Sequence, residues 1–204
     1  MTVARTISRI ATLATLAVLV AACGTTPASL TGTATSTSPS PAAAESAVHN
    51  AADTEFAQMM IIHHQGALEM ATLAITQASS EEVRSLAVQI SAAQGPEIDT
   101  MTGWLDAWGE DQPASAEMNA MEHEGMQMGG QDQAAVMAEL ATLTGDDFDR
   151  SFLQVMTEHH SGAIAMAETE VAEGSNAEAL ALAGRIIDAQ MAEITEMSQL
   201  LSTM

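Results

Sequence analysis

Apolar residues recur along much of this chain at alternating spacings of three and four, which is the pattern of helices that bury one face. One such stretch covers about residues 53–77 and a second covers about 81–108. The inner face of the first is Phe56, Met60, His63, Ala67, Met70 and Ala74. The inner face of the second is Leu86, Ile90, Ala93, Glu97, Met101 and Leu105. Ser79 and Ser80 mark the turn between the two helices, and Pro96 predicts a kink or local disturbance inside the second.

The same unit occurs twice in the chain. Residues 53–105 and 149–201 align without a gap at a constant offset of 96. Further helices are therefore predicted at about 147–173 and 177–202, with a turn at Gly174 and Ser175. A single helical hairpin cannot bury its own apolar stripe, whereas two hairpins packed together can.

The connection between the two copies is long and contains one short predicted helix, at about 133–143. Short loop, long crossover and short loop is the order found in ferritin-like bundles. The sequence therefore predicts an all-α fold, a ferritin-like four-helix bundle. Its parts are repeat 1 (53–108), the crossover (109–145) and repeat 2 (146–203).

Each copy contains two adjacent histidines, in the stretches DTEFAQMMIIHHQGALEMA and DRSFLQVMTEHHSGAIAMA. In an antiparallel hairpin, residues equidistant from the turn lie at the same height. We therefore expect Gln94 and Glu97 level with the first histidine pair, and Gln190 and Glu193 level with the second. One methionine lies three residues before the first histidine of each pair and another lies seven after it, so both share its helical face.

Burying so many polar groups is costly unless they hydrogen-bond one another or bind a ligand. The glutamates could bond the histidines as a purely structural device, but two equivalent histidine pairs favour metal. The proposed main ligands are His63, His64, His159 and His160. The proposed secondary ligands are Met60, Met70, Met156 and Met166, although a methionine at helical spacing is more often a core residue. The residues expected to orient the imidazoles, or to act as occasional ligands, are Gln94, Gln190, Glu97 and Glu193.

The ligand types favour copper over iron. Di-iron sites in helical bundles use a Glu from each helix and a Glu three residues before a His. Here that position is Met60 in the first copy and Met156 in the second. Imidazole with thioether suits copper, because Cu(I) favours methionine and Cu(II) favours histidine and carboxylate. Another divalent metal remains an open alternative.

The crossover contains a second candidate site for a soft metal. Within 11 residues it has Met118, Met121, His123, Met126 and Met128. The alternative is a linker whose methionines pack loosely on the bundle.

Charge and cysteine content narrow the choice of partners. The chain has 5 Lys and Arg residues against 27 Asp and Glu residues, a formal net charge of −22. This argues against nucleic acid, because phosphate binding needs a basic surface, and makes cations plausible partners. The single cysteine, Cys23, excludes an internal disulfide and thiolate chemistry within the folded domain. No protein partner can be identified from the sequence.

The N-terminus has the layout of an export signal. Two arginines precede an apolar run at 10–20, too short to span a membrane, and the sequence VAAC ends at Cys23. Small residues before a lone cysteine resemble a bacterial lipoprotein signal, and a plain secretory signal is the alternative. We therefore expect a signal peptide at 1–22, a disordered tether at 23–48 and the bundle at 49–204. The protein would be exported and anchored by lipidated Cys23 to the outer face of the cell membrane.

The stretch MIIHHQGALEMA at 60–71, with Gln94 and Glu97, resembles the bacterial family catalogued as domain of unknown function three-zero-five (DUF305). The second copy is equally similar, and together the copies cover nearly all of the folded region. The resemblance implies an exported, ferritin-like helical bundle, and some relatives are associated with copper binding and tolerance. Many relatives have a proline before the histidine pair. Here Ile62 and Glu158 take that place, so Glu158 could add a carboxylate in the second copy only.

The resulting hypothesis is an extracytoplasmic metal-binding protein for copper sequestration or transfer, with binding favoured over catalysis. Two alternatives remain open. One is a ferritin-like metal-dependent oxidase, against which the small number of inward carboxylates argues. The other is a metal-free bundle with a structural or partner-binding role.

Overall fold

Five α-helices make up the described part of the chain. The computed structural model describes residues 48–113 and 133–204, and within these ranges it contains no strand. The helices are α2 (Ala51–Gln77), α3 (Glu81–Trp108), α4 (Gln133–Leu140), α5 (Gly145–Glu173) and α6 (Ala177–Thr203). The all-α class is confirmed, and every predicted helix ends within a few residues of its expected limits.

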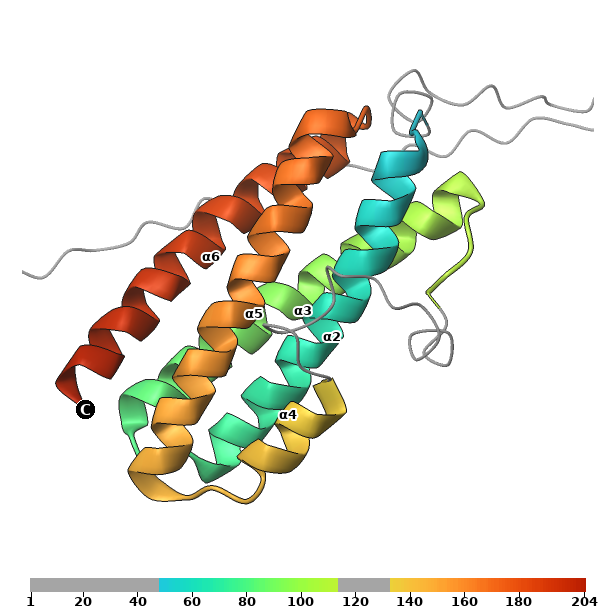
Figure 1. The fold of residues 1–204 in the computed structure, drawn as a ribbon. Helices are drawn as coiled ribbons and strands as arrows, with labels where there is room; N and C mark the ends of the chain where they lie inside the picture. Colours follow the sequence, from blue (N-terminus) through green and yellow to red (C-terminus); the bar gives the residue numbers. More distant parts are fainter. Residues whose placement is uncertain (1–47, 114–132) are drawn as a thin grey trace, which may run out of the picture. The chain divides into compact units, whose positions relative to one another are not determined.

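Each copy of the repeat forms a pair of packed helices, and the two pairs meet through their first helices. α2 lies along α3, α5 lies along α6, and α2 packs against α5 (Figure 1). The short helix α4 contacts α5. The start of α2 is bonded to the turn after α5, and the start of α5 to the turn after α2. The two central helices therefore run antiparallel.

Local capping explains where the helices begin and end. The Asn50 side chain accepts hydrogen bonds from the backbone N–H of Ala52 and Asp53, and the Asp53 carboxylate accepts one from the Asn50 N–H. This reciprocal capping box starts α2. α3 ends at Gly109, whose left-handed backbone (φ 76°) favours glycine. α3 also runs through Pro96 without a break, so the predicted disturbance does not interrupt it.

The Asp53 carboxylate ties α2 to the other helix pair. It accepts hydrogen bonds from the backbone N–H of Asn176 at 2.9 Å, the N–H of Ser175 at 3.0 Å and the Ser175 hydroxyl at 2.9 Å. Burial alone would raise the pKa of Asp53. Hydrogen bonds from Asn176, Asn50, Glu170 and Ser175 outweigh burial and hold that pKa below its usual value.

Asp149 makes the equivalent connection in the opposite direction. Its carboxylate accepts hydrogen bonds from the Ser79 N–H at 2.9 Å, the Ser79 hydroxyl at 2.6 Å and the Ser80 N–H at 2.7 Å. Asp149 is also buried, with 1% of its surface exposed. Each aspartate thus supplies acceptors to the N-terminus of the second helix of the other pair. Both residues recur in the sequence repeat, but only the structure identifies their partners.

A polar layer divides the core into two apolar clusters. One cluster gathers the second half of α2, the first half of α3, the start of α5 and the end of α6. The other gathers the complementary segments, from the first half of α2 to the start of α6. The polar layer between them consists of residues 63–64, 94–97, 159–160 and 190–193.

One detail of the core differs from the predictions. Ala93 was expected on the inner face of α3 but is exposed, and Gln94 is buried instead. The inner positions 90, 94, 97 and 101 still follow helical spacing, with the four-residue step before the three-residue step. All three phenylalanines of the chain are buried in the core: Phe56, Phe148 and Phe152.

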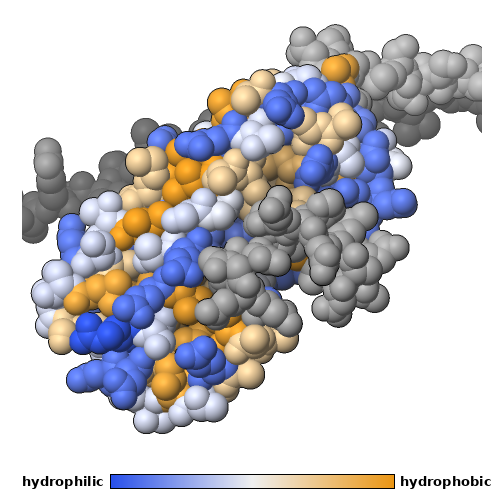
Figure 2. Space-filling model, viewed as in Figure 1, coloured by the Kyte–Doolittle hydropathy of each residue, from blue (hydrophilic) through white to orange (hydrophobic). Residues whose placement is uncertain are grey.

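The surface mixes hydrophilic and hydrophobic residues, as the face drawn in Figure 2 shows. Among the described residues, no helix is long and apolar enough to cross a membrane. Several predictions concern residues outside the described ranges: the signal peptide, Cys23, the tether up to residue 47, and the methionine and histidine cluster at 118–128.

Candidate metal centre

The polar layer brings together residues from four helices, at the middle of the core. α2 contributes His63 and His64, and α5 contributes His159 and His160. α3 contributes Gln94 and Glu97, and α6 contributes Gln190 and Glu193. The four histidines and two glutamines are buried, while the glutamates are partly exposed. The heights expected from hairpin geometry are therefore realised in both copies.

The first histidines of the two pairs meet across the packed helices α2 and α5. The ring centroids of His63 and His159 are 3.6 Å apart, and the rings are tilted by 42°. The two copies therefore contribute to one continuous layer, a relationship that the sequence did not establish.

The second histidine of each pair bonds the glutamate of its own copy. His64 Nε2 lies 2.8 Å from Glu97 Oε2, and His160 Nε2 lies 2.5 Å from Glu193 Oε2. Both imidazole rings are fully buried, whereas each glutamate reaches solvent with part of its side chain. A carboxylate accepts, so each pair assigns the ring proton to Nε2 and leaves Nδ1 with a lone pair in the neutral ring.

Burial keeps the first histidines neutral. Burial, followed by the charges of His64 and His160, lowers the pKa of His63 to about 3. Burial also holds the pKa of His159 well below its usual value, with His63 as the next cause. Protonation in this layer would place positive charges close together in an apolar setting. At neutral pH these two imidazoles are therefore uncharged, which is the form that binds metal.

Several buried atoms of the layer have no hydrogen-bond partner. They are Nδ1 of all four histidines, both side-chain amide atoms of Gln94 and Oε1 of Gln190. Buried polar atoms without partners are rare, and so many in one layer suggest a ligand. Metal-binding histidines usually donate their second ring N–H to a carboxylate, which fixes the tautomer. His64 with Glu97, and His160 with Glu193, have this arrangement.

The methionines proposed as secondary ligands lie on both sides of the layer. Met70 and Met156 belong to one apolar cluster. Met60 belongs to the other, and the partly buried Met166 packs against it. Because α2 and α5 are antiparallel, each side of the layer has one methionine from each copy. Their thioethers also fill the core, so a role as ligand stays a prediction.

No three His, Cys, Asp or Glu side chains in the described ranges are already gathered around a point that could hold a metal ion. Two imidazoles of this layer are turned toward glutamates. A metal bound here would therefore combine imidazoles with thioethers, or require a ring to turn.

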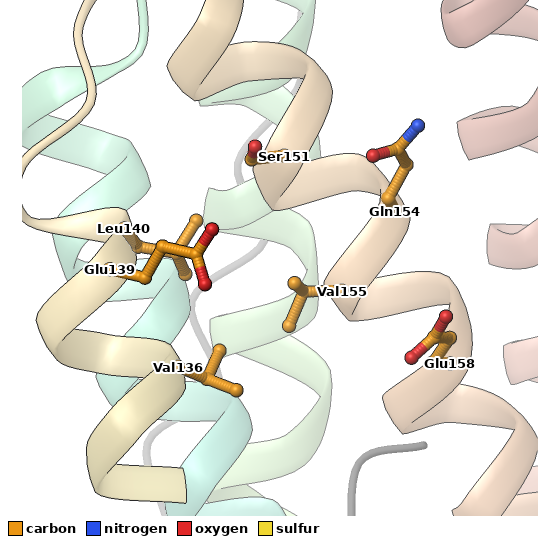
Figure 3. Close-up of a pocket in the computed structure, with 7 residues that line it drawn as sticks. All are labelled: Val136, Glu139, Leu140, Ser151, Gln154, Val155 and Glu158. Carbon is orange, nitrogen blue, oxygen red and sulfur yellow. The ribbon is translucent and has the colours of Figure 1, made fainter. Parts of the chain in front are cut away.

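Glu158, which could have added a carboxylate to the second copy, lies elsewhere. It is exposed and lines a pocket of about 170 Å³ between α4 and α5, together with Glu139, Gln154 and apolar residues. Figure 3 shows Glu139 and Glu158 on opposite sides of this pocket. No histidine lines it.

The structure also buries an acid that the sequence analysis missed. Glu170 is 1% exposed, and apart from Asp53 its carboxyl oxygens have no hydrogen-bond partner among the described residues. Burial, followed by the hydrogen bond and charge of Asp53, raises the pKa of Glu170 to about 8. The equivalent residue of the first copy is Ala74. The sequence signal that could have identified this buried acid is the glutamate at an inner helix position where the first copy has alanine.

Gly174 provides the space for this acid. A Cβ at Gly174 would lie 2.3 Å from a carboxyl oxygen of Glu170. The first copy has Ala78 at this position and Ala74 in place of the acid. Gly174 and Ala78 have similar extended backbones. The glycine is therefore needed for the space left by its missing Cβ and not for a special backbone conformation.

Comparison with known proteins identifies the family. A model described as domain of unknown function (DUF305) matches residues 53–201. The chain belongs to the DUF305 family. The resemblance inferred from the doubled histidine motif is therefore confirmed. No curated protein matches the chain.

Solved structures of DUF305 proteins are similar in sequence and fold. A presumed secreted DUF305 protein from Streptomyces coelicolor is 36% identical, covers 74% of this chain and 91% of its own, and has a TM-score of 0.65. A DUF305 fragment from Deinococcus radiodurans is 31% identical, covers 76% of this chain and 98% of its own, and has a TM-score of 0.64.

The protein CopM is also similar. Its Cu(II)-bound form is 35% identical, covers 74% of this chain and 96% of its own, and has a TM-score of 0.62. CopM structures also exist in Cu(I)-bound, Ag-bound and apo forms.

Proposed function

We propose that this chain is an extracytoplasmic protein that binds copper in the polar layer, for sequestration or transfer. The observation that carries the proposal is the set of four buried imidazoles whose Nδ1 atoms lack partners. Burial keeps two of them neutral, and carboxylates orient the other two. Imidazole nitrogen next to thioether sulfur suits copper in both oxidation states. Copper binding by CopM supports the same metal.

The two copies are proposed to share one site. The close approach of His63 and His159 supports this, since a metal near either ring lies near both copies. His64 and His160 would present Nδ1 while Glu97 and Glu193 hold their Nε2 protons. We further propose a ferritin-like arrangement of the two helix pairs, supported by the contact between α2 and α5 and by the crossover length.

A metal-free bundle is the second candidate. The His–Glu hydrogen bonds favour it, as does the absence of three ready ligands among the described residues. Such a layer would fix the register of the helices and bind nothing. The two candidates differ in the effect of removing imidazoles: the first loses metal, and the second loses stability alone.

The test is a titration with Cu(I) and Cu(II), by competition with a chromophoric chelator, on a His63→Ala, His64→Ala variant. We expect the loss of one copper-binding event while circular dichroism remains helical. Gln65→Ala is the matched control, because Gln65 is the exposed neighbour of the pair. Unchanged copper binding by the folded double variant would refute the proposal. If that variant does not fold, His160→Gln gives the same comparison with a smaller change.

We also propose that the chain is exported and held by lipid at Cys23, with the tether at 23–48 between the membrane and the bundle. The sequence layout and the similarity to a presumed secreted relative support export. A Cys23→Ser variant should leave the membrane fraction or mislocalise. Equal partitioning of the variant and the wild type into membranes would contradict the lipid anchor.

A further inference from the structure

We propose that His49 and Glu110 form a second metal site, at the surface, that takes a divalent cation of the Cu(II) type. The site lies where the start of α2 meets the end of α3. His49 Nε2 lies 3.1 Å from Glu110 Oε1. Both residues line a pocket of about 560 Å³ that also contains Glu55, Gln58 and Met59. The pocket therefore offers imidazole, carboxylate and thioether groups.

The imidazole of His49 is held in place by an aromatic ring. It stacks on Trp108 with ring centroids 4.5 Å apart and an angle of 6° between the planes. Trp108 in turn stacks on Trp104 at 5.8 Å. The His49 side chain is 18% exposed, so part of it reaches solvent. A ligand that is already oriented loses less entropy when it binds metal.

The backbone of Glu110 is held by the turn that follows α3. The Glu110 N–H donates to the Leu105 carbonyl at 2.9 Å, within the turn that closes the helix. The Gln58 side chain holds the next residue by donating to the Asp111 carbonyl at 2.8 Å. A carboxylate on a fixed backbone beside a stacked imidazole is more than a chance surface ion pair, which would contribute little.

The surrounding charge favours a cation. The C-terminal end of α3 has partial negative charge, and the chain has a formal net charge of −22. The positive end of α2 is offset by its cap, because the backbone N–H of Asn50 donates to the Asp53 carboxylate. Imidazole with carboxylate suits Cu(II) and, more weakly, Zn(II), while soft Cu(I) would prefer the thioethers of the core. This site uses none of the residues of the polar layer, so it does not depend on the proposed core site.

Tryptophan fluorescence tests this proposal directly. The chain has two tryptophans, and both belong to this ring stack. Aqueous Cu(II) is titrated into the wild type and into His49→Gln, Glu110→Gln and Glu55→Gln variants, with circular dichroism as the check of folding. Glu55→Gln is the matched control, since it removes the same charge from the same pocket without removing the His49 partner.

We expect saturable quenching in the wild type and a loss of at least about tenfold in apparent affinity for His49→Gln, because even residues that only orient ligands cost that much. Glu110→Gln should weaken the event more than Glu55→Gln does. The same quenching should persist in the His63→Ala, His64→Ala variant. The proposal would be overturned if Cu(II) quenched the His49→Gln variant with the same apparent affinity as the wild type. Equal losses of affinity in Glu110→Gln and Glu55→Gln would also overturn it. Loss of quenching in the core variant alone would assign the signal to the polar layer and also overturn it.

Discussion

The imidazole rings of His63 and His159 lie 3.6 Å apart, although 96 residues separate them in the chain. Each belongs to a different copy of the repeat, and the helices that carry them run antiparallel. The pairing makes the polar layer a joint product of both copies. A metal site built there would depend equally on substitutions in either copy.

Removing the orienting carboxylates should weaken copper binding without removing a main ligand. In a Glu97→Gln, Glu193→Gln variant, the amides no longer fix the protons of His64 and His160 on Nε2. We expect affinity for Cu(I) to fall by about 10–100-fold, as for other residues that support metal ligands. Chelator competition measures the change.

The control for that variant is Glu196→Gln, which removes an exposed acid from the same helix as Glu193. It should leave the affinity unchanged. If the double variant also binds copper as the wild type does, the two glutamates have only a structural role.

Asp149 should contribute strongly to stability. Asp149→Ala removes the acceptor of three hydrogen bonds from Ser79 and Ser80 at the start of α3. Buried donors without partners cost free energy, so the free energy of unfolding should fall by about 1–3 kcal/mol. Urea denaturation measures it. Asp147 is an exposed acid two residues earlier. The control Asp147→Ala should change the free energy of unfolding by about 0.3–1 kcal/mol, through the helix dipole. Equal effects would show that Asp149 acts through charge alone.

The sequence predicted the helices and the height of the polar layer because both depend on local geometry. Helix limits follow from periodicity and from caps such as Ser80. The alignment of Glu97 with the first histidine pair follows from the length of one tight turn. These relationships lie within a single copy, where few residues separate the partners.

The relationships between copies could not be predicted. The contact of His63 with His159 depends on how α2 and α5 pack, and the long crossover does not restrict that register. Two aspartates, Asp53 and Asp149, set it by bonding the opposite turns. Their partners are backbone N–H groups of serine and asparagine together with serine hydroxyls, which form no recognisable pattern in the sequence.

The methionines beside the layer should select for Cu(I) if they are ligands. Met60 and Met156 are fully buried, one in each apolar cluster. In a Met60→Leu, Met156→Leu variant, affinity for Cu(I) should fall while affinity for Cu(II) changes little, because thioether prefers the softer ion. Leucine keeps most of the side-chain volume of methionine, so the free energy of unfolding should change by less than about 1.5 kcal/mol per substitution.

Met101→Leu is the control for this variant. Met101 is equally buried in the same cluster as Met60, but it belongs to α3 and is not a proposed ligand. The Met101→Leu variant should bind Cu(I) with the same affinity as the wild type. If the double variant also does so, these methionines are core residues only.

Glu170 should make stability depend on pH. Its pKa is raised to about 8 in the folded chain, against an ordinary value of 4.5. Between these values the folded state keeps a proton that the unfolded state has lost, so the contribution of Glu170 to stability falls as pH rises from about 4.5 to 8. Below the ordinary histidine pKa of 6.5, His63 and His159 act in the opposite direction, because they stay neutral in the folded state and bind protons in the unfolded state. The fall in the stability of the wild type should therefore be seen between about pH 6.5 and 8 and then level off. The slope from Glu170 is at most about 1.4 kcal/mol per pH unit. Glu170→Gln should remove this dependence, and Glu168→Gln, an exposed neighbour, should not.

The first copy supplies a sharper version of this test. Gly174→Ala alone should destabilise the fold, because its Cβ would lie 2.3 Å from a Glu170 carboxyl oxygen. Glu170→Ala with Gly174→Ala reproduces the Ala74 and Ala78 pair of the first copy. The double variant should therefore regain the part of the lost stability that comes from overlap with the Glu170 side chain, whereas the Glu170 carbonyl oxygen, 2.7 Å from the added Cβ, would still have to shift. It should also no longer lose stability between pH 6.5 and 8. Urea denaturation at both pH values for all four members of the cycle measures the coupling. Additive effects of the two substitutions would show that Glu170 does not occupy the space beside Gly174.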